Sequence, residues 1–359
     1  MRRFGAFLVA VGLAATTLVA QSPASLPGAK YGADPNYQVP RTPDGRPDLQ
    51  GVWANNNVTP MTRPTQWANK AQITPAELEE LKRLVAQNAS DGGDAIFQNL
   101  VQLALDAKDK GGKFTQDSYD PSTGNYNEFW MVEREWDLRT SLIIDPPNGQ
   151  QPPLTADGQK RLGGGRRGGP GLNNPQTPQP RRPEGPEDLP LGERCLSFGA
   201  PRTGAGYNSY LQIIQSPETV VLLQEMAHDA RMVPITNKTT LPGSVRQWLG
   251  KPNGRWEGDT LVVETTNYLN GFMGSSADVK VTERFTRVAK DYINWVITVD
   301  DPKTWTKPWS FMIRLKQSDD QIYEYACHEG NQSMIGILAG ARREEQKEAA
   351  ANRTGQQQP

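Results

Sequence analysis

Hydrophobic and polar residues alternate along much of the second half of the chain. The pattern is clearest over 292–299 and 309–316, where bulky apolar residues take every second position: Ile293, Trp295, Ile297 and Val299, then Trp309, Phe311, Ile313 and Leu315. Successive side chains of a β-strand point to opposite faces of a sheet. The spacing therefore predicts two strands, each with one apolar and one polar face.

Further segments rich in strand-favouring residues lie between about residues 210 and 327, separated by turn signals such as Lys290-Asp291. Asn253-Gly254 is predicted to turn the chain into a central strand. The eight predicted strands cover 211–215, 219–227, 231–235, 256–266, 280–288, 292–300, 309–316 and 322–327. Eight is the number at which small barrels close around one ligand. The predicted fold is mainly β, an antiparallel meander that closes into a lipocalin-like β-barrel.

Helical patterns flank the predicted barrel. Thr74-Pro75-Ala76-Glu77 combines an N-cap, a proline at the first helical position and an acidic residue in the first turn, and leucines at helical spacing follow. A second helix is expected over 96–105, and both helices are expected to cover the barrel as a lid. Two more strands are predicted at 127–132 and 139–144, and a short helix from residue 333.

The N-terminus has the pattern of an export signal. Arg2 and Arg3 precede an almost wholly apolar run, Phe4 to Ala20. The predicted organisation is a signal peptide (1–20), an extended polar lead (21–50), first strands and helical lid (51–162), a disordered Gly/Pro/Arg-rich loop (163–190), the barrel meander (191–332) and a C-terminal helix and tail (333–359). A disordered loop is expected because so few apolar residues cannot offset its chain entropy. The protein is therefore expected in the periplasm or outside the cell.

Composition narrows the range of partners. The 359 residues include 39 Lys and Arg and 40 Asp and Glu, a net charge of −1, so we expect no nucleic-acid partner. Nothing after residue 20 resembles a membrane span, which argues against stable membrane insertion. The chain contains no Gly-x-Ser-x-Gly, phosphate-binding loop, dinucleotide fingerprint or Cys-x-x-Cys motif, and we expect no cofactor. The oligomeric state stays open.

The chain has two cysteines, Cys195 and Cys327. A pair of cysteines in an exported protein most simply forms a disulfide. The alternative is a nucleophilic Cys327 activated by His328. Adjacent residues on a strand point to opposite faces, so this histidine is badly placed for that role.

Both histidines, His228 and His328, lie at predicted strand ends among carboxylates, with Glu225 and Asp229 near the first. The first and last strands of a closing barrel are neighbours, so we expect the two rings within roughly 10 Å of one another at one rim. They could act with Glu225 as general acid and base, or bind a metal, although the spacing matches no established metal motif and we predict none. Alternatively, these groups only tie strand ends together, with Arg231 pairing to a carboxylate.

Glu264 and Glu283, with Arg284, lie on two neighbouring predicted strands, and at least one of the carboxylates is expected inside the barrel. A buried glutamate either pairs with an arginine or keeps its proton. The residues predicted to bind ligand are Arg231, Glu264, Glu283, Trp295 and Tyr325. The expected function is binding of a small, largely apolar molecule, with aromatic side chains as walls. The alternatives are a hydrolase or lyase, and a carbohydrate-binding module with exposed Trp305 and Trp309.

Four segments together resemble a family of exported bacterial proteins of unknown function: Gly-Arg-Pro-Asp-Leu-Gln-Gly-Val-Trp (45–53), Arg-Thr-Ser-Leu-Ile-Ile-Asp-Pro-Pro-Asn-Gly (139–149), Trp-Glu-Gly-Asp-Thr-Leu-Val-Val-Glu-Thr-Thr-Asn (256–267) and Tyr-Glu-Tyr-Ala-Cys-His-Glu-Gly-Asn (323–331). The resemblance covers most of the chain after the signal peptide and implies no activity. Separately, Gly51-x-Trp53 resembles the opening of lipocalin-type barrels, in which the tryptophan plugs one end.

Overall fold

The computed structural model describes residues 30–89, 100–109, 134–163, 182–235 and 241–355. The predicted signal peptide, the predicted strand 127–132, the start of the predicted helix 96–105 and residues 164–181 of the predicted disordered loop lie outside this range. Residues 182–190 of that loop are described and contain a short 3-10 turn, Pro186–Asp188.

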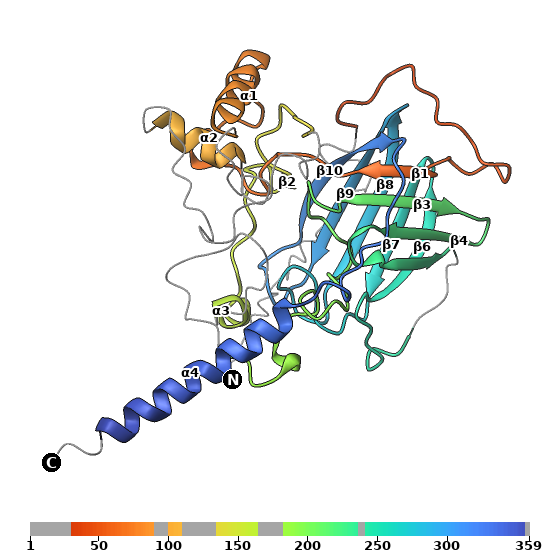
Figure 1. Ribbon diagram of the computed structural model, residues 1–359. Coiled ribbons are helices and arrows are strands. Elements are labelled where there is room, and N and C mark those ends of the chain that lie inside the picture. The colour runs from red at the N-terminus through yellow and green to blue at the C-terminus, as the bar shows by residue number, and fades with distance from the viewer. Residues whose placement is uncertain (1–29, 90–99, 110–133, 164–181, 236–240, 356–359) are drawn as a thin grey trace, which may run out of the picture.

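Strands and helices follow in the order of the labels in Figure 1. The strands are β1 (Gly51–Ala54), β2 (Ile143–Asp145), β3 (Tyr210–Gln215), β4 (Thr219–Gln224), β5 (Ala230–Pro234), β6 (Lys251–Glu257), β7 (Thr260–Thr266), β8 (Lys280–Ala289), β9 (Tyr292–Asp300) and β10 (Trp309–Ser318). The helices are α1 (Pro75–Ala89), α2 (Leu100–Asp109), α3 (Ala156–Gly163) and α4 (Ser333–Gly355). Short 3-10 turns are Thr65–Trp67 and Met226–His228, besides the one given above.

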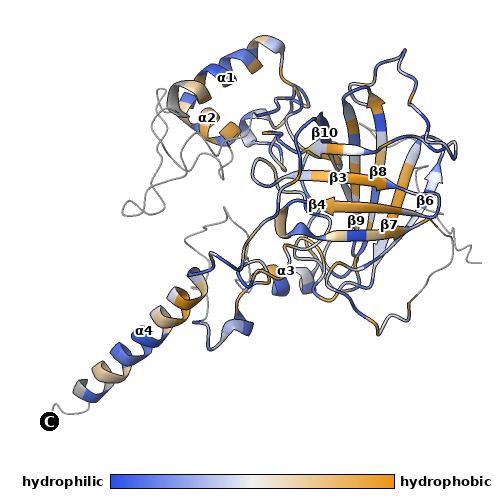
Figure 2. Cartoon of the chain, turned by 45° about the vertical axis from the view of Figure 1, so that its right-hand side comes forward, coloured by the Kyte–Doolittle hydropathy of each residue, from blue (hydrophilic) through white to orange (hydrophobic). Residues whose placement is uncertain are grey.

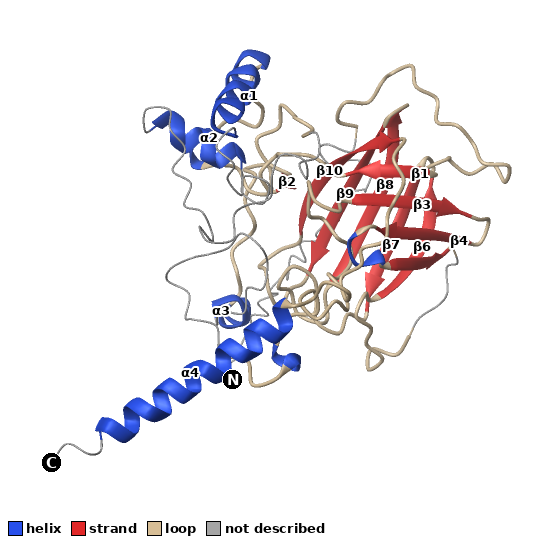
Figure 3. Ribbon diagram, in the orientation of Figure 1, coloured by secondary structure: helices blue, strands red, loops and turns tan. Residues whose placement is uncertain are grey.

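All of these strands belong to one antiparallel sheet (Figure 3). Its order is β5-β4-β3-β1-β10-β9-β8-β7-β6, and β2 pairs with β10 outside this path. Two meanders, β3 to β5 and β6 to β10, are each built from strands that follow one another in sequence. The short N-terminal strand β1 lies between them, pairing with β3 on one side and β10 on the other. The mainly β, antiparallel fold is confirmed.

The predicted closure into a barrel is wrong, because within the described residues no hydrogen-bonded ladder joins β5 to β6. The two edge strands nevertheless lie side by side. A Cβ added to Gly254 of β6 would lie 2.6 Å from Ile235 Cδ1 and 2.8 Å from Val233 Cγ1. Pro234 in β5 and Pro252 in β6 have no N–H to donate to a ladder. The seam is therefore held by side-chain packing, and we call it the β5–β6 seam.

Two strand predictions need correction. The predicted strand 256–266 is a hairpin, β6 and β7, that turns at Gly258 with φ +58°, and Asn253-Gly254 lies inside β6 rather than in a turn. Residues 322–327 are irregular, although they include the strand-favouring Ile322, Tyr323 and Tyr325. The two sides of β10 are already taken by β9 and by β1 with β2, so this segment has no partner there.

Large side chains fill the interior of the curved sheet, along strands that are mostly hydrophobic in Figure 2. Phe285 and Trp295 stack with their ring centroids 5.3 Å apart. Trp305 and Trp309, expected to be exposed for carbohydrate binding, are 2% and 0% exposed, so that prediction is wrong. Trp53 is also fully buried, and its indole N–H donates to the Leu49 carbonyl at 2.9 Å.

The helices lie outside this core. Thr74 and Glu77 form the predicted cap of α1: each backbone N–H donates to the other residue's side chain, at 2.8 and 3.2 Å. α1 and α2 share a separate apolar cluster on the β2 side of the molecule, and α4 extends away from the body (Figure 1). Among the described residues, no helix is both long and apolar enough to cross a membrane.

The predicted disulfide is confirmed: Cys195 and Cys327 are bonded across a sequence separation of 132 residues. It joins the segment before β3 to the irregular segment after β10. Ser197, two residues after the first cysteine, donates a 2.8 Å hydrogen bond to the Asp229 carboxylate. This bond connects the disulfide-linked segments to the residue just before β5.

Candidate functional site

A small pocket lies where β1 ends, β3 begins and β4 ends. We call it the rim pocket, and its lining residues are Asn55, Arg202, Asn208, Ser209, Tyr210, Leu211, Gln224, Trp295 and Leu315. It encloses about 10 Å³, which is room for one group of about the size of a water molecule. Trp295, Leu211 and Gln224 belong to strands, and loops supply Asn55, Arg202 and Asn208.

Three buried polar atoms around the rim pocket have no hydrogen-bond partner among the described residues. They are the indole Nε1 of Trp295, the side-chain Oε1 of Gln224 and the guanidinium Nε of Arg202. Trp295 is 1% exposed and Gln224 is 4% exposed. A buried polar group without a partner typically costs about 1–3 kcal/mol. Three residues that line the rim pocket thus each carry one buried polar atom, two donors and one acceptor in all, that no described residue satisfies.

The strand pattern explains two of these atoms. Trp295 occupies an inward position of β9, within the alternation already visible in the sequence. On β4, Val220 and Leu222 are the buried inward residues, and Gln224 follows at the next inward position, where the strand ends. A polar side chain at the last inward position of a strand lies at the end of the curved sheet's interior instead of at its centre.

Arg202 lies on the loop before β3 and contacts aromatic rings. Its guanidinium carbon is 5.4 Å from the centroid of the Phe198 ring, and Phe198 meets Tyr325 edge to face at 6.0 Å. Burial lowers the pKa of Arg202, and the Tyr325 phenol acts in the opposite direction. No carboxylate of the described residues forms an ion pair with Arg202. Its charge is therefore partly desolvated and has no carboxylate partner in the part of the chain that the structure describes.

Glu225 follows Gln224 directly and is buried at the mouth of the rim pocket. Burial raises the pKa of Glu225, while the Tyr210 backbone N–H and the Asn208 side chain bond to the carboxylate and oppose that rise. Its backbone carbonyl accepts a hydrogen bond from the His228 N–H at 3.0 Å, within a tight turn in which His228 has φ +55°. A backbone hydrogen bond thus joins Glu225 and His228, while the pairing of their side chains stays a prediction. This carboxyl keeps its proton to higher pH than a free glutamate and can serve as a proton donor.

His328 is exposed in the irregular segment, next to the disulfide, and His228 is exposed as well. The two histidine rings were expected to lie close together because the first and last strands of a closed barrel are neighbours. That argument does not hold, because residues 322–327 form no strand and β1 separates β3 from β10. The disulfide and the Ser197–Asp229 hydrogen bond still link the two segments. A shared histidine site stays a prediction.

Arg231 and Glu283 meet inside the sheet. Two hydrogen bonds of 2.6 and 2.8 Å join the guanidinium to the carboxylate, and their side chains are 1% and 0% exposed. The hydroxyl-bearing Tyr268 beside them is fully buried, and burial, followed by the Glu283 charge, raises its pKa. Arg231 and Glu283, both predicted to bind ligand, are therefore engaged with each other in a filled interior.

Glu264, in contrast to the buried Glu283, is exposed to solvent. It lies on the outer face of β7, where its carboxylate is 3.1 Å from Arg255 Nη1 and its side chain is 41% exposed. Of the two glutamates expected near the interior, only Glu283 lies there.

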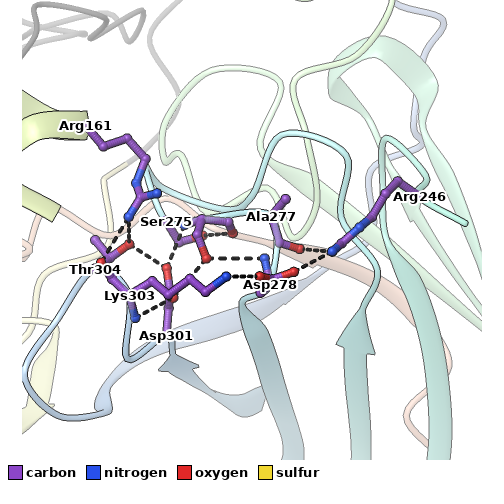
Figure 4. Close-up of polar contacts among 9 residues, drawn as sticks. Arg161, Arg246, Ser275, Ala277, Asp278, Asp301, Lys303 and Thr304 are labelled. Atoms are coloured by element: carbon purple, nitrogen blue, oxygen red, sulfur yellow. Dashed lines mark hydrogen bonds and ion pairs between the residues drawn. The ribbon is translucent and has the colours of Figure 1, made fainter. Parts of the chain in front are cut away.

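A second polar cluster, shown in Figure 4, surrounds Asp301 and links two loops. The carboxylate accepts hydrogen bonds from the backbone and hydroxyl of Ser276, from the Thr304 hydroxyl and from the Lys303 backbone. Burial alone would raise the pKa of Asp301, but the hydrogen bonds from Thr304 and Ser276 hold it below its ordinary value. Nearby, Asp278 pairs with Arg246 and Lys303. Because both Asp301 oxygens have partners, this cluster is a structural clamp.

Of the residues proposed from the sequence, Trp295 lines the rim pocket. Glu225 bonds to the lining residues Tyr210 and Asn208, and Tyr325 interacts with Arg202. Arg202 and Gln224 were missed. Gln224 had a signal, a polar residue continuing an inward apolar alternation, whereas Arg202 comes from a loop without any pattern. Within the described part of the chain, no three His, Cys, Asp or Glu side chains gather as metal ligands would. Comparisons with protein-family models, with curated proteins and with solved structures each found no match for this chain.

Proposed function

We propose that this is an exported protein, periplasmic or secreted, that binds a small organic molecule at the rim pocket. The observation that carries the proposal is that three residues lining one pocket each carry a buried polar atom without a partner among the described residues: Trp295 Nε1, Gln224 Oε1 and Arg202 Nε. Small-molecule sites typically combine apolar walls with a few convergent polar groups. The disulfide supports an oxidising compartment.

The dimensions of the rim pocket define how such a molecule would bind. A space of about 10 Å³ admits only one small polar group of the ligand. The rest of the molecule would lie outside it, against Phe198, which is 39% exposed, and Tyr325. The ligand is thus amphipathic, with a polar head in the rim pocket and an apolar body on the aromatic pair, instead of an apolar molecule enclosed by a barrel.

The test follows the Trp295 indole by NMR. The chain has nine tryptophans, so ¹⁵N-labelled tryptophan gives up to nine indole signals, and Trp295→Phe assigns the one of interest. Hexanoate, hexanamide and 1-hexanol serve as probes. We expect at least one of them to shift the Trp295 signal in a saturable manner. Trp309 is an internal control, because its Nε1 is also buried without a partner but does not line the rim pocket.

A matched pair of variants makes the test specific. Gln224→Leu removes the acceptor and should weaken binding of hexanamide and 1-hexanol, whose N–H or O–H can donate to it, about fivefold or more. Gln212→Leu, on the outer face of β3, should leave their binding unchanged. If no probe moves the Trp295 signal, or if Trp309 shifts equally, the proposed site is wrong.

A hydrolase or lyase is the second candidate, favoured by Glu225 with its raised pKa at the pocket mouth. The same samples separate the two functions. An enzyme acting on an ester of the probe acid would produce new small-molecule signals, and Glu225→Gln would stop their formation while the Trp295 response remained.

A further inference from the structure

We propose that the rim pocket selects ligands with an anionic head, a carboxylate in particular, and that Arg202 is the residue that recognises it. This inference rests on the proposed function and specifies its ligand class. It goes beyond the expectation of a largely apolar ligand, since the polar head provides the selectivity.

The first reason is the contrast between Arg202 and two buried arginines that are paired with carboxylates. Arg139 has Asp137 at 2.7 Å, and Arg231 has Glu283 at 2.6 Å. A third buried arginine, Arg63, bonds instead to the Thr140 hydroxyl and the Pro147 carbonyl. Arg202 has a ring beneath it and no carboxylate among the described residues, although burial is strong enough to lower its pKa. A desolvated cation without a counter-charge is costly, and an anion delivered from solution removes that cost.

The second reason is the match of hydrogen-bonding groups. Trp295 Nε1–H and Arg202 Nε–H are both donors, and both are unpartnered. A carboxylate accepts hydrogen bonds only and can take two donors at once, in a charge-assisted geometry. The remaining acceptor, Gln224 Oε1, has nothing to accept from a carboxylate and can contribute only to the binding of neutral heads that carry an N–H or O–H.

The third reason is the fixed aromatic surface beside the head-group site. Phe198 follows Cys195 by three residues, and Tyr325 precedes Cys327 by two. The disulfide therefore holds together the two segments that carry the aromatic pair. Their edge-to-face contact presents an apolar wall next to a cation, which fits an acid with a short hydrocarbon body.

The experiment compares hexanoate with hexanamide, which has nearly the same shape but no charge. In the wild-type protein, we expect hexanoate to bind at least about tenfold more tightly, judged from titration of the Trp295 indole signal. Arg202→Gln should remove this preference, and Arg202→Lys should retain part of it because the positive charge stays. Arg255→Gln, an arginine on the outer face, is the matched control and should retain the full preference.

The outcomes separate the inference from the proposed function. If hexanamide or 1-hexanol binds as tightly as hexanoate, the site exists but does not select anions, and the inference is overturned. The same holds if Arg202→Gln, shown to be folded by its unchanged Trp309 signal, keeps the preference. If none of the three probes shifts Trp295, both proposals fail.

Discussion

Two glutamate–arginine pairs on this sheet lie in opposite environments. Glu283 and Arg231 are sealed in the interior with 2.6 and 2.8 Å hydrogen bonds, whereas Glu264 and Arg255 lie 3.1 Å apart in contact with water. Removing one partner of a buried pair leaves a charge that is neither solvated nor compensated. Removing one partner of an exposed pair leaves a charge that water solvates well.

We therefore predict that Glu283→Gln lowers the free energy of unfolding by about 3–5 kcal/mol, and that Glu264→Gln lowers it by less than about 1 kcal/mol. Urea denaturation of the two variants beside the wild type measures the difference. Replacing both interior partners, with Arg231→Met and Glu283→Leu, should recover much of the loss. Equal effects of the two single changes would show that the interior pair is hydrated, contrary to its zero exposure.

At the scale of elements, β5 and β6 are in contact at the β5–β6 seam through their side chains, with no ladder of backbone hydrogen bonds between them. Gly254 gives β6 room to approach the side chains of Val233 on β5 and of Ile235 directly after it. Its backbone φ is not in the left-handed region, so the need for glycine here comes from space and not from backbone conformation.

Gly254→Ala should accordingly destabilise the protein by about 1–3 kcal/mol, the usual cost of overpacking. The matched control is Gly243→Ala, at a position where an added Cβ meets nothing within 4 Å. The melting temperatures of both variants, measured beside that of the wild type, test this prediction. If Gly254→Ala melts like the wild type, the two edge strands are not in close contact.

The elements also show what a sequence can and cannot predict. Alternation predicted β9 and β10 because that signal is local to each strand. Strand-favouring residue types were misleading at 322–327, where β10 has no free side to pair with, and at β6 and β7, where apolar bulk on both sides of Gly258 concealed a turn. Glu225, Trp295 and Tyr325 were identified by residue type, but Arg202 joins them only through the three-dimensional path of its loop.

At the scale of the whole molecule, the disulfide closes a loop of 132 residues that contains the sheet strands β3 to β10. In the chain-entropy model, a loop of that length stabilises the folded state by about 4–5 kcal/mol. We predict that replacing both cysteines by serine lowers the free energy of unfolding by roughly this amount. Urea denaturation with and without reductant gives the comparison, since the reduced wild type should match the double variant. A change of less than about 1 kcal/mol would mean that the bond restrains little of the unfolded chain.

The position of β1 has a consequence for the order in which the chain can fold. This strand is the first of the sheet in sequence, yet it pairs with β10, the last. During synthesis β1 leaves the ribosome long before its partner exists, so the two meanders cannot be joined until nearly the whole chain has emerged. Forming such distant contacts late is slow, because the intervening chain must first be ordered. The complete native sheet can therefore form only once β10 is available, late in the folding of this chain.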